Sequence, residues 1–276
     1  MKRENNFEKI EVNGKNREYL FRAPHVDKKY PLLILLHGGL ENSVDIEKST
    51  GMSLLARKEG FAVVYPNAIN GRWNDGREVL KEKYDDVLFI SRLIDNILNS
   101  YNIDSKRVYA CGLSNGGMMV HRLSAELSHK LTAIASVAGN MPKSVGDNFS
   151  IEREISALII HGTEDPIVPY NGGEVKSNLQ GLVLSARETA MKYVNANRCS
   201  KIPKIEWLNK ESMDKCKVKL EKFSKGKRGT EVFFYTVENG GHCWHGTSKP
   251  YPSSIVGNYC RDINVSELIL NFFKTH

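Results

Sequence analysis

Continuous apolar runs alternate with helical patterns along most of this chain, and that alternation restricts its fold more than any other feature. The runs lie at 31–38 (PLLILLHG), 61–67 (FAVVYPN), 107–112 (RVYACG), 131–139 (LTAIASVAG), 156–162 (SALIIHG) and 231–241 (EVFFYTVENGG). Unbroken apolar runs of this length are typical of strands buried on both faces of a sheet. Because helical patterns separate the runs, we predict a mostly parallel sheet with right-handed crossovers and helices on both faces.

The helical patterns supply the crossovers between these strands. They lie at 46–60, 85–101, 115–130, 184–197 and 264–276. Gly60 is a C-cap signal for the first helix, and Asp85 or Asp86 is the predicted N-cap of the second. Before them, two stretches with period-two alternation flank Asn13-Gly14, which predicts an antiparallel hairpin at a sheet edge. We therefore expect an α/β chain with about eight strands, the first two forming the hairpin.

The surplus of positive charge is concentrated in one block. The chain carries 39 Lys and Arg against 32 Asp and Glu, a net charge of +7, and much of the excess lies within Lys201–Arg228. This block lacks the regular aromatic residues of a nucleic-acid stacking platform, so we interpret it as solvated surface and predict no nucleic-acid partner. It is also too long for a plain loop. We predict one domain, 1–276, with an inserted basic segment or a small cap at about 199–230.

Composition excludes some further classes of protein. With 41% hydrophobic residues the chain can bury a sizeable core, but no stretch reaches the apolar length of about 18 residues that a membrane span requires. We therefore predict no membrane partner. The charged N-terminus has no apolar h-region, so we expect a cytoplasmic protein as the sequence stands, or a secreted one if a leader has been removed.

The five cysteines form no C-x-x-C motif, which argues against a zinc ribbon or a redox motif. An odd count leaves at least one free thiol. Pairing among Cys199, Cys216, Cys243 and Cys260 stays open, and Cys199 with Cys216 is one option in an exported protein. The oligomeric state is likewise left open by the sequence.

The candidate nucleophile lies where the third apolar run gives way to a helix. Residues 112–116 read GLSNG, a G-x-S-x-G motif. A strand-to-helix turn this tight forces strained backbone angles on its central residue, and small neighbours let the chain fold back. The turn would raise Ser114 Oγ above the sheet and point the next amides at a developing oxyanion. An ordinary glycine-rich turn is the alternative interpretation.

A serine nucleophile needs a base, and the base needs an orienting carboxylate. Glu164 and Asp165 follow the apolar run at 156–162. We favour Asp165 as the acid, because the following Pro166 biases its backbone towards an extended conformation that can aim the carboxylate at the site. Glu164 is the second choice, and a solvated loop acid is the alternative interpretation.

The last apolar run ends in a glycine pair followed by histidines. His242 comes directly after Gly240-Gly241 and is the predicted base, with His245 as the alternative. His37 and His161 each end a strand, and we interpret them as structural hydrogen-bonding groups beneath the site. The histidines show no zinc-ligand spacing, so we predict no metal.

A second glycine pair, Gly38-Gly39, follows the first apolar run. A glycine there lets a backbone amide approach the substrate oxygen closely. We predict that the N–H groups of Gly39 and Asn115 form an oxyanion hole, with the Leu40 N–H as a fallback. A flexible turn is the alternative interpretation.

Taken together, these motifs resemble one family. The stretches LLHGG, VVYPNAINGRWNDG, GLSNGGMMVHRLSAEL, AIASVAGNMP, IIHGTEDPIVPYNGG and GGHCWHG are similar to those of the feruloyl esterase and polyhydroxybutyrate depolymerase group of α/β-hydrolases. The likeness is close over about 30–175 and returns at 231–246. It implies an α/β-hydrolase fold and hydrolysis of carboxylic esters without a cofactor, through Ser114, Asp165 and His242.

The resemblance also implies where substrate binds. It brings Trp73 and Trp244 to the mouth of the site, and we add Leu40 and Tyr170 to the predicted substrate-binding residues. An aromatic wall suits a phenolic acyl group, a sugar face or a polyester chain. We therefore expect a small-molecule or polysaccharide-linked ester, with a feruloyl ester as the first choice.

Several alternatives remain beside the feruloyl esterase prediction. They are a polyhydroxybutyrate or hydroxyacid-oligomer depolymerase, an acetyl xylan esterase, an acyl peptidase and, from a different class, a non-catalytic protein that binds polysaccharide or nucleic acid.

Overall fold

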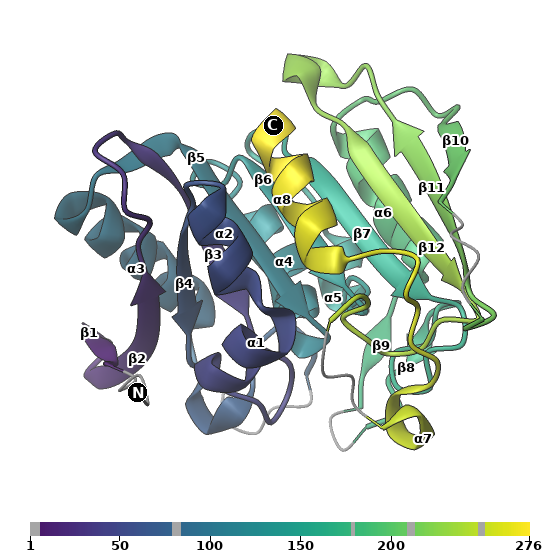
Figure 1. Cartoon of the computed structure of the whole chain (residues 1–276), viewed down its shortest axis with the longest axis horizontal. Coiled ribbons are helices and arrows are strands. Elements are labelled where there is room, and N and C mark those ends of the chain that lie inside the picture. Colours follow the sequence, from purple (N-terminus) through teal and green to yellow (C-terminus); the bar gives the residue numbers. More distant parts are fainter. Residues whose placement is uncertain (1–5, 79–83, 178–179, 209–212, 248–251) are drawn as a thin grey trace.

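The computed structural model describes residues 6–78, 84–177, 180–208, 213–247 and 252–276, and within them ten strands form one sheet (Figure 1). In spatial order the strands are β1 (Glu8–Val12), β2 (Lys15–Arg22), β4 (Ala62–Pro66), β3 (Tyr30–Leu36), β5 (Ile103–Leu113), β6 (Ala133–Val137), β7 (Ser156–Gly162), β12 (Val232–Glu238), β11 (Lys217–Phe223) and β10 (Lys204–Trp207). The six central strands run parallel, and the outer strands pair antiparallel. The predicted mostly parallel sheet and the N-terminal hairpin are therefore confirmed.

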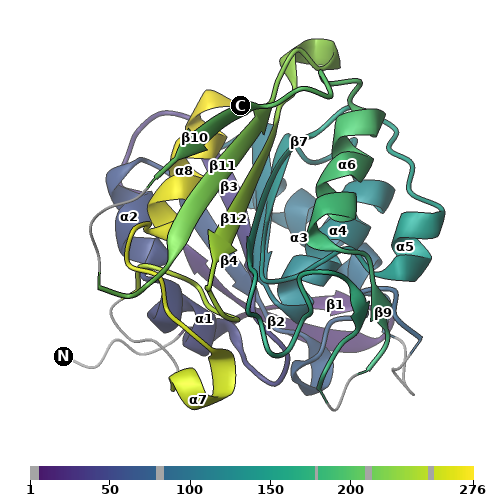
Figure 2. The same cartoon turned by 90° about the vertical axis from the view of Figure 1, so that its right-hand side faces the viewer.

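Helices cover both faces of this sheet (Figures 1 and 2). One layer consists of α1 (Ser43–Thr50), α2 (Met52–Lys58) and α8 (Val265–Thr275), and the other of α3 (Asp86–Ser100), α4 (Asn115–Glu126), α5 (Lys143–Asp147) and α6 (Ala186–Ala196). Successive strand residues point to opposite faces, so Leu32 and Ile34 join one core while Leu33 and Leu35 join the other. This two-sided burial explains why the strands are continuously apolar.

The helix expected at 46–60 is two helices instead of one. Gly51 lies between α1 and α2 with φ 61°. That left-handed conformation ends α1, and it is one that glycine adopts without steric cost. The local pattern of apolar residues continues across the break, so periodicity alone predicts a single helix.

The basic block adds strands to the sheet. Its described residues include β10 and β11, which extend the sheet beyond β12 and raise the strand number above the expected eight. The block alternates charged and apolar residues, as in KVKLEKF of β11, which suits a sheet edge with one buried face. Residues 209–212 of the predicted segment at 199–230 lie outside the described residues.

The carboxyl ends of the parallel strands position the candidate site. The segments that follow β3, β5, β7 and β12 carry the predicted oxyanion glycine, nucleophile, acid and base, in that order. Since these strands are parallel neighbours or near neighbours, their carboxyl ends meet at one edge of the sheet. A short helix, α7 (Ser253–Val256), and a two-stranded sheet of β8 (Gly173–Glu174) and β9 (Leu182–Val183) lie at the same edge (Figure 2).

Candidate active site

The predicted nucleophile sits at a strained strand-to-helix turn. Ser114 has φ 55° and ψ −120°, directly after β5 and before the first residue of α4. Its N–H donates to Val137 O at 2.9 Å, and its C=O accepts from Met118 N at 2.8 Å. These backbone bonds hold a conformation that costs a residue with a side chain of the order of 1–3 kcal/mol.

The residues around the turn must be glycines, because a Cβ at these positions would clash with neighbouring backbone atoms. A Cβ at Gly112 would lie 2.5 Å from Gly116 backbone atoms, and a Cβ at Gly116 would lie 2.5 Å from the His37 and Leu36 carbonyl oxygens. Gly139, which follows β6, is equally constrained, because its Cβ would meet Ser114 O at 2.5 Å. The G-x-S-x-G motif predicted small residues at Gly112 and Gly116, although the Gly116 contact is with the end of β3, whereas Gly139 lies outside the motif and was missed.

Asp165 and His242 form a hydrogen-bonded pair. His242 Nδ1 lies 2.8 Å from Asp165 Oδ2, and the Asp165 side chain is fully buried. The other carboxylate oxygen, Oδ1, accepts from the Ile167 and Val168 amides at 2.8 Å each. A carboxylate held by these bonds is rigid, and it fixes the imidazole with Nδ1 protonated and Nε2 as the free nitrogen.

The surroundings keep Asp165 ionised. Burial by itself raises the pKa of this carboxyl, but the charge of His242 and hydrogen bonds from His161 and His242 outweigh it and lower the pKa below its usual value. His161 Nε2 lies 3.2 Å from Asp165 Oδ2 and 2.9 Å from Val168 O. His161 is thus a buried positioning group beneath the carboxylate, as its place at the end of β7 predicted.

Ser114 and His242 line one cavity of about 510 Å³. No hydrogen bond joins their side chains among the residues that the structure describes. Catalytic hydrogen bonds of this kind are often long until substrate binds. Most of the remaining lining is apolar, and its other described residues are Gly38, Gly39, Leu40, Glu41, Arg72, Arg77, Leu113, Asn115, Met118, Ile167, Val175, Ser177, Ile255 and Val256.

The predicted oxyanion donors border this cavity. Gly39 and Asn115 both line it, whereas the fallback amide of Leu40 already donates to Gly71 O at 2.7 Å. Leu40 has φ 66°, which turns its side chain outward to 69% exposure at the cavity. Leu40 therefore remains a candidate for substrate contact, and Gly39 and Asn115 remain the candidate donors.

The Asn115 side chain ties the nucleophile turn to the WNDG stretch. Its Oδ1 accepts from Trp73 N at 2.8 Å, and its Nδ2 donates to Trp73 O at 3.1 Å and to Asp75 Oδ2 at 2.7 Å. Asp75 is held in turn by a buried ion pair with Arg77, at 2.8 Å. This network fixes the first residue of α4, and hence the direction of the Asn115 amide.

Comparison with known proteins identifies the family. A family model described as phospholipase/carboxylesterase matches residues 23–200. The chain belongs to the phospholipase/carboxylesterase family. It is therefore a carboxylic ester hydrolase, as the motifs predicted, and not a non-catalytic binding protein.

Individual relatives of this carboxylesterase are esterases at low identity. It is 26% identical to "Putative esterase NocK" of Nocardia uniformis subsp. tsuyamanensis, over 95% of this chain and 80% of that protein. It is 28% identical to feruloyl esterase B of Piromyces equi, over 78% of this chain and 40% of that protein. It is also 28% identical to feruloyl esterase C of Emericella nidulans, over 61% of each chain. The carboxylesterase thus spans less than two thirds of both feruloyl esterases.

Solved structures support the fold. Acetyl xylan esterase from Aspergillus awamori matches with a TM-score of 0.63 at 14% identity, covering 86% of this carboxylesterase and 94% of that chain. The α/β-hydrolase fold is therefore confirmed. Each helix in the described parts of the chain is too short or too polar to span a lipid bilayer.

Three predicted substrate-binding residues of the carboxylesterase lie away from the cavity lining. Trp73 is fully buried and donates from Nε1 to His37 O at 3.0 Å. Trp244 is 4% exposed, and its Nε1 donates to Ser266 at 2.9 Å. The half-buried Tyr170 bonds Thr236 at 3.0 Å. Each of these side chains makes a hydrogen bond inside the protein, and none of the three is among the described residues that line the cavity.

The second-choice acid and base, Glu164 and His245, take no part in the Asp165–His242 pair. Glu164 is exposed, while its neighbour Asp165 is buried against His242. His245 is buried, and its Nδ1 accepts from Cys260 N at 3.1 Å. Burial lowers the pKa of His245 to about 4, so it is neutral near pH 7. His37 is buried in the same way, with Nδ1 2.7 Å from Gly38 O and Nε2 accepting from Ala68 N at 3.0 Å.

Several cavity residues were not predicted from the sequence. Met118 lies one helical turn after Ser114, so its spacing on α4 was an available signal. Ile255 and Val256 come from α7, a four-residue helix with no recognisable motif. Arg72 also lines the cavity, and its side chain has no hydrogen-bond or ion-pair partner within the described parts of the chain. Its place beside the WNDG stretch was the only sequence signal.

Proposed function

We propose that this carboxylesterase hydrolyses its substrates through a Ser114–His242–Asp165 triad and a covalent acyl-enzyme. The observation that carries the proposal is the hydrogen bond from His242, which shares its cavity with Ser114, to a buried and ionised Asp165. That bond leaves His242 Nε2 as the proton acceptor for the serine hydroxyl.

The reaction proceeds in two steps, acylation of Ser114 and hydrolysis of the acyl-enzyme. Ser114 Oγ attacks the ester carbonyl while His242 takes its proton, and the Gly39 and Asn115 amides donate to the tetrahedral oxyanion. His242 then protonates the leaving alcohol as the acyl-enzyme forms. Water, activated by the same imidazole, attacks the acyl carbon, and the proton returns to Ser114 as the acid leaves. Asp165 holds the imidazole throughout and stabilises its cationic form.

Hydroxycinnamoyl esters, such as feruloyl esters, are the proposed substrates. Apolar side chains including Leu113, Met118 and Ile167 line the cavity, and its volume of about 510 Å³ is within the range for a small aromatic acid. Two relatives are named feruloyl esterases, which supports the same substrate class. One solved structure with a similar fold is named an acetyl xylan esterase, so esters of a short acyl group serve as the comparison substrates.

Active-site labelling tests the triad, and a substrate panel tests the substrate class. A fluorophosphonate should modify the chain once, and peptide mass mapping should locate the adduct on Ser114. The panel compares kcat/KM for methyl ferulate, acetylated xylan, p-nitrophenyl acetate and butyrate, and hydroxybutyrate oligomers. A folded chain that takes no label would overturn the triad. A label on Ser114 with acetate esters preferred over ferulate would overturn only the substrate class.

One observation favours a second candidate, the hydrolysis of hydroxyacid oligomers. Arg72 lines the apolar cavity without a partner of its own among the described residues, unlike Arg77, which is paired with Asp75. A guanidinium in such a setting is suited to bind a carboxylate. Hydroxyacid oligomers end in a free carboxylate, whereas a methyl ferulate ester carries no anion.

Replacing Arg72 distinguishes these two candidates. If Arg72 binds a terminal carboxylate, Arg72→Gln should lower kcat/KM for a hydroxybutyrate trimer by about 10- to 100-fold, the size of a charge-assisted hydrogen bond. The methyl ester of the same trimer should change little. Arg92→Gln, at an exposed arginine on α3, is the matched control and should change neither. Equal losses on acid and methyl ester would rule out carboxylate recognition by Arg72.

A further inference from the structure

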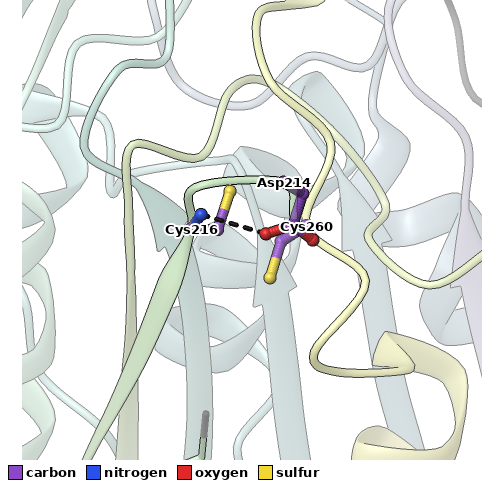
Figure 3. A group of neighbouring side chains, drawn as sticks. All are labelled: Asp214, Cys216 and Cys260. Carbon is purple, nitrogen blue, oxygen red and sulfur yellow. Dashed lines mark hydrogen bonds between the residues drawn. The ribbon is translucent and has the colours of Figure 1, made fainter. Parts of the chain in front are cut away.

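Three potential metal ligands meet on the active-site edge of the sheet, outside the catalytic cavity. The Sγ atoms of Cys216 and Cys260 and a carboxylate oxygen of Asp214 all lie within 4.8 Å of one another (Figure 3). Asp214 and Cys216 precede β11, and Cys260 lies between α7 and α8. Both cysteines are buried free thiols. Two segments far apart in the sequence therefore supply a compact S₂O donor set.

Backbone hydrogen bonds hold these donors in position. Asp214 Oδ1 accepts from Cys216 N at 3.0 Å, and Oδ2 accepts from Arg261 N at 2.6 Å. The amide of Cys260 donates to the ring of His245 at 3.1 Å. A carboxylate oxygen has two lone pairs, so one such hydrogen bond does not prevent it from binding a cation. Outer hydrogen bonds of this kind orient metal ligands in known sites.

The charge of the cluster also suits a cation. Asp262, which is 3% exposed, acts electrostatically on both thiols together with Asp214. The two thiols are therefore buried beside carboxylates, a setting in which a divalent cation can replace the thiol protons.

We propose that Asp214, Cys216 and Cys260 form a binding site for one divalent metal ion of the zinc class. Thiolate ligands select Zn²⁺ and similar borderline ions over Mg²⁺ or Ca²⁺, and a single carboxylate is an accepted third ligand. As each metal–sulfur bond forms, the thiol proton leaves to solvent. Three protein ligands leave one tetrahedral position for water.

An ion at this site would tie together the segments that support the catalytic histidine. His242 N donates to Val256 O at 2.6 Å, and Gly241 N donates to Asn258 O at 2.8 Å. On the other side, Asn239 Nδ2 donates to Lys215 O at 2.9 Å. The metal would join the segment before β11 to the segment ending at Cys260, and the histidine loop lies between them. Its role is therefore structural, and its binding does not depend on the proposed triad.

Cobalt substitution tests the site in the full chain. The protein is stripped of metal, kept reduced with a phosphine, and titrated with Co²⁺. We expect one Co²⁺ per chain, with a thiolate-to-cobalt charge-transfer band and the visible bands of tetrahedral Co²⁺, all bleached by Zn²⁺. Cys216→Ser and Cys260→Ser should abolish the charge-transfer band, and Asp214→Asn should weaken Co²⁺ affinity by about 10-fold or more. Cys199→Ser, at a buried thiol on the other face of the sheet, should leave both unchanged.

A second measurement on the unmodified chain keeps the proposal testable if a variant does not fold. Zn²⁺ should protect Cys216 and Cys260, but not Cys199, from iodoacetamide during brief partial opening, as read by mass spectrometry. Three results would overturn the proposal. They are no stoichiometric Co²⁺ band in the wild type, the same band in both cysteine variants, or a Cys216–Cys260 disulfide that forms equally fast with and without Zn²⁺.

Discussion

The Ser114→Ala variant should fold normally and lose kcat by about 10⁶-fold, because no other group can form the acyl-enzyme. Ser114 occupies the strained turn at φ 55°, and alanine can adopt this conformation at similar cost. The residual rate should come from the oxyanion donors and substrate binding alone. The measurement is kcat on p-nitrophenyl butyrate, with circular dichroism to verify the fold.

Ser105→Ala is the matched control for this experiment. Ser105 is exposed near the opposite end of β5, and its replacement should leave kcat unchanged. If Ser114→Ala keeps more than about a hundredth of the wild-type kcat while folded, Ser114 is not the nucleophile.

The Asp165→Asn variant should reduce kcat by about 10⁴-fold with little change in KM. The carbonyl oxygen of the introduced amide can still accept from the Ile167 and Val168 amides, which turns its NH₂ group towards His242 Nδ1. The imidazole would then carry its proton on Nε2, where it cannot take the serine proton. The position of the imidazole is kept but its proton is on the wrong nitrogen, so the variant loses rate in the chemical step rather than affinity for substrate.

Glu164→Gln provides the comparison that separates the two acids. Glu164 is exposed and adjacent in sequence, so its replacement should leave kcat near wild type. A large loss in Glu164→Gln, together with activity in Asp165→Asn, would transfer the orienting role to Glu164 and disprove the proposed pairing.

Much of the fold could be predicted from the sequence because the determining signals are local. The apolar runs 31–38 and 156–162 are strands β3 and β7 in the structure, and the turn at Asn13-Gly14 joins β1 to β2. The two added strands of the basic block were not predicted, because charged residues such as those in KVKLEKF conceal a buried alternate face. Their pairing in register beside β12 makes them strands.

The candidate site likewise contains residues that could be predicted from the sequence and residues that could not. The need for Gly112 and the position of Asp165 before Pro166 follow from near neighbours in the chain, and the G-x-S-x-G motif predicts Gly116 although its contact is with the end of β3. The positions of the tryptophans could not be predicted in this way. The sequence fits Trp73 and Trp244 equally well in the cavity wall or in the core until the hydrogen-bond partners of their Nε1 atoms are known. The side chain of Arg72, without a partner among the described residues, is likewise a property of the packed cavity rather than of any motif.

Short-range patterns were enough to establish the alternation of strands and helices, the nucleophile turn and the chain order of the candidate triad, because steric and hydrogen-bonding rules act over a few residues. The folded chain was needed to show that His242 meets Asp165 across 77 residues, that Cys216 lies beside Cys260, and that both tryptophans are buried. These outcomes depend on how distant segments pack at the sheet edge, and packing is a property of the whole fold that no short pattern encodes.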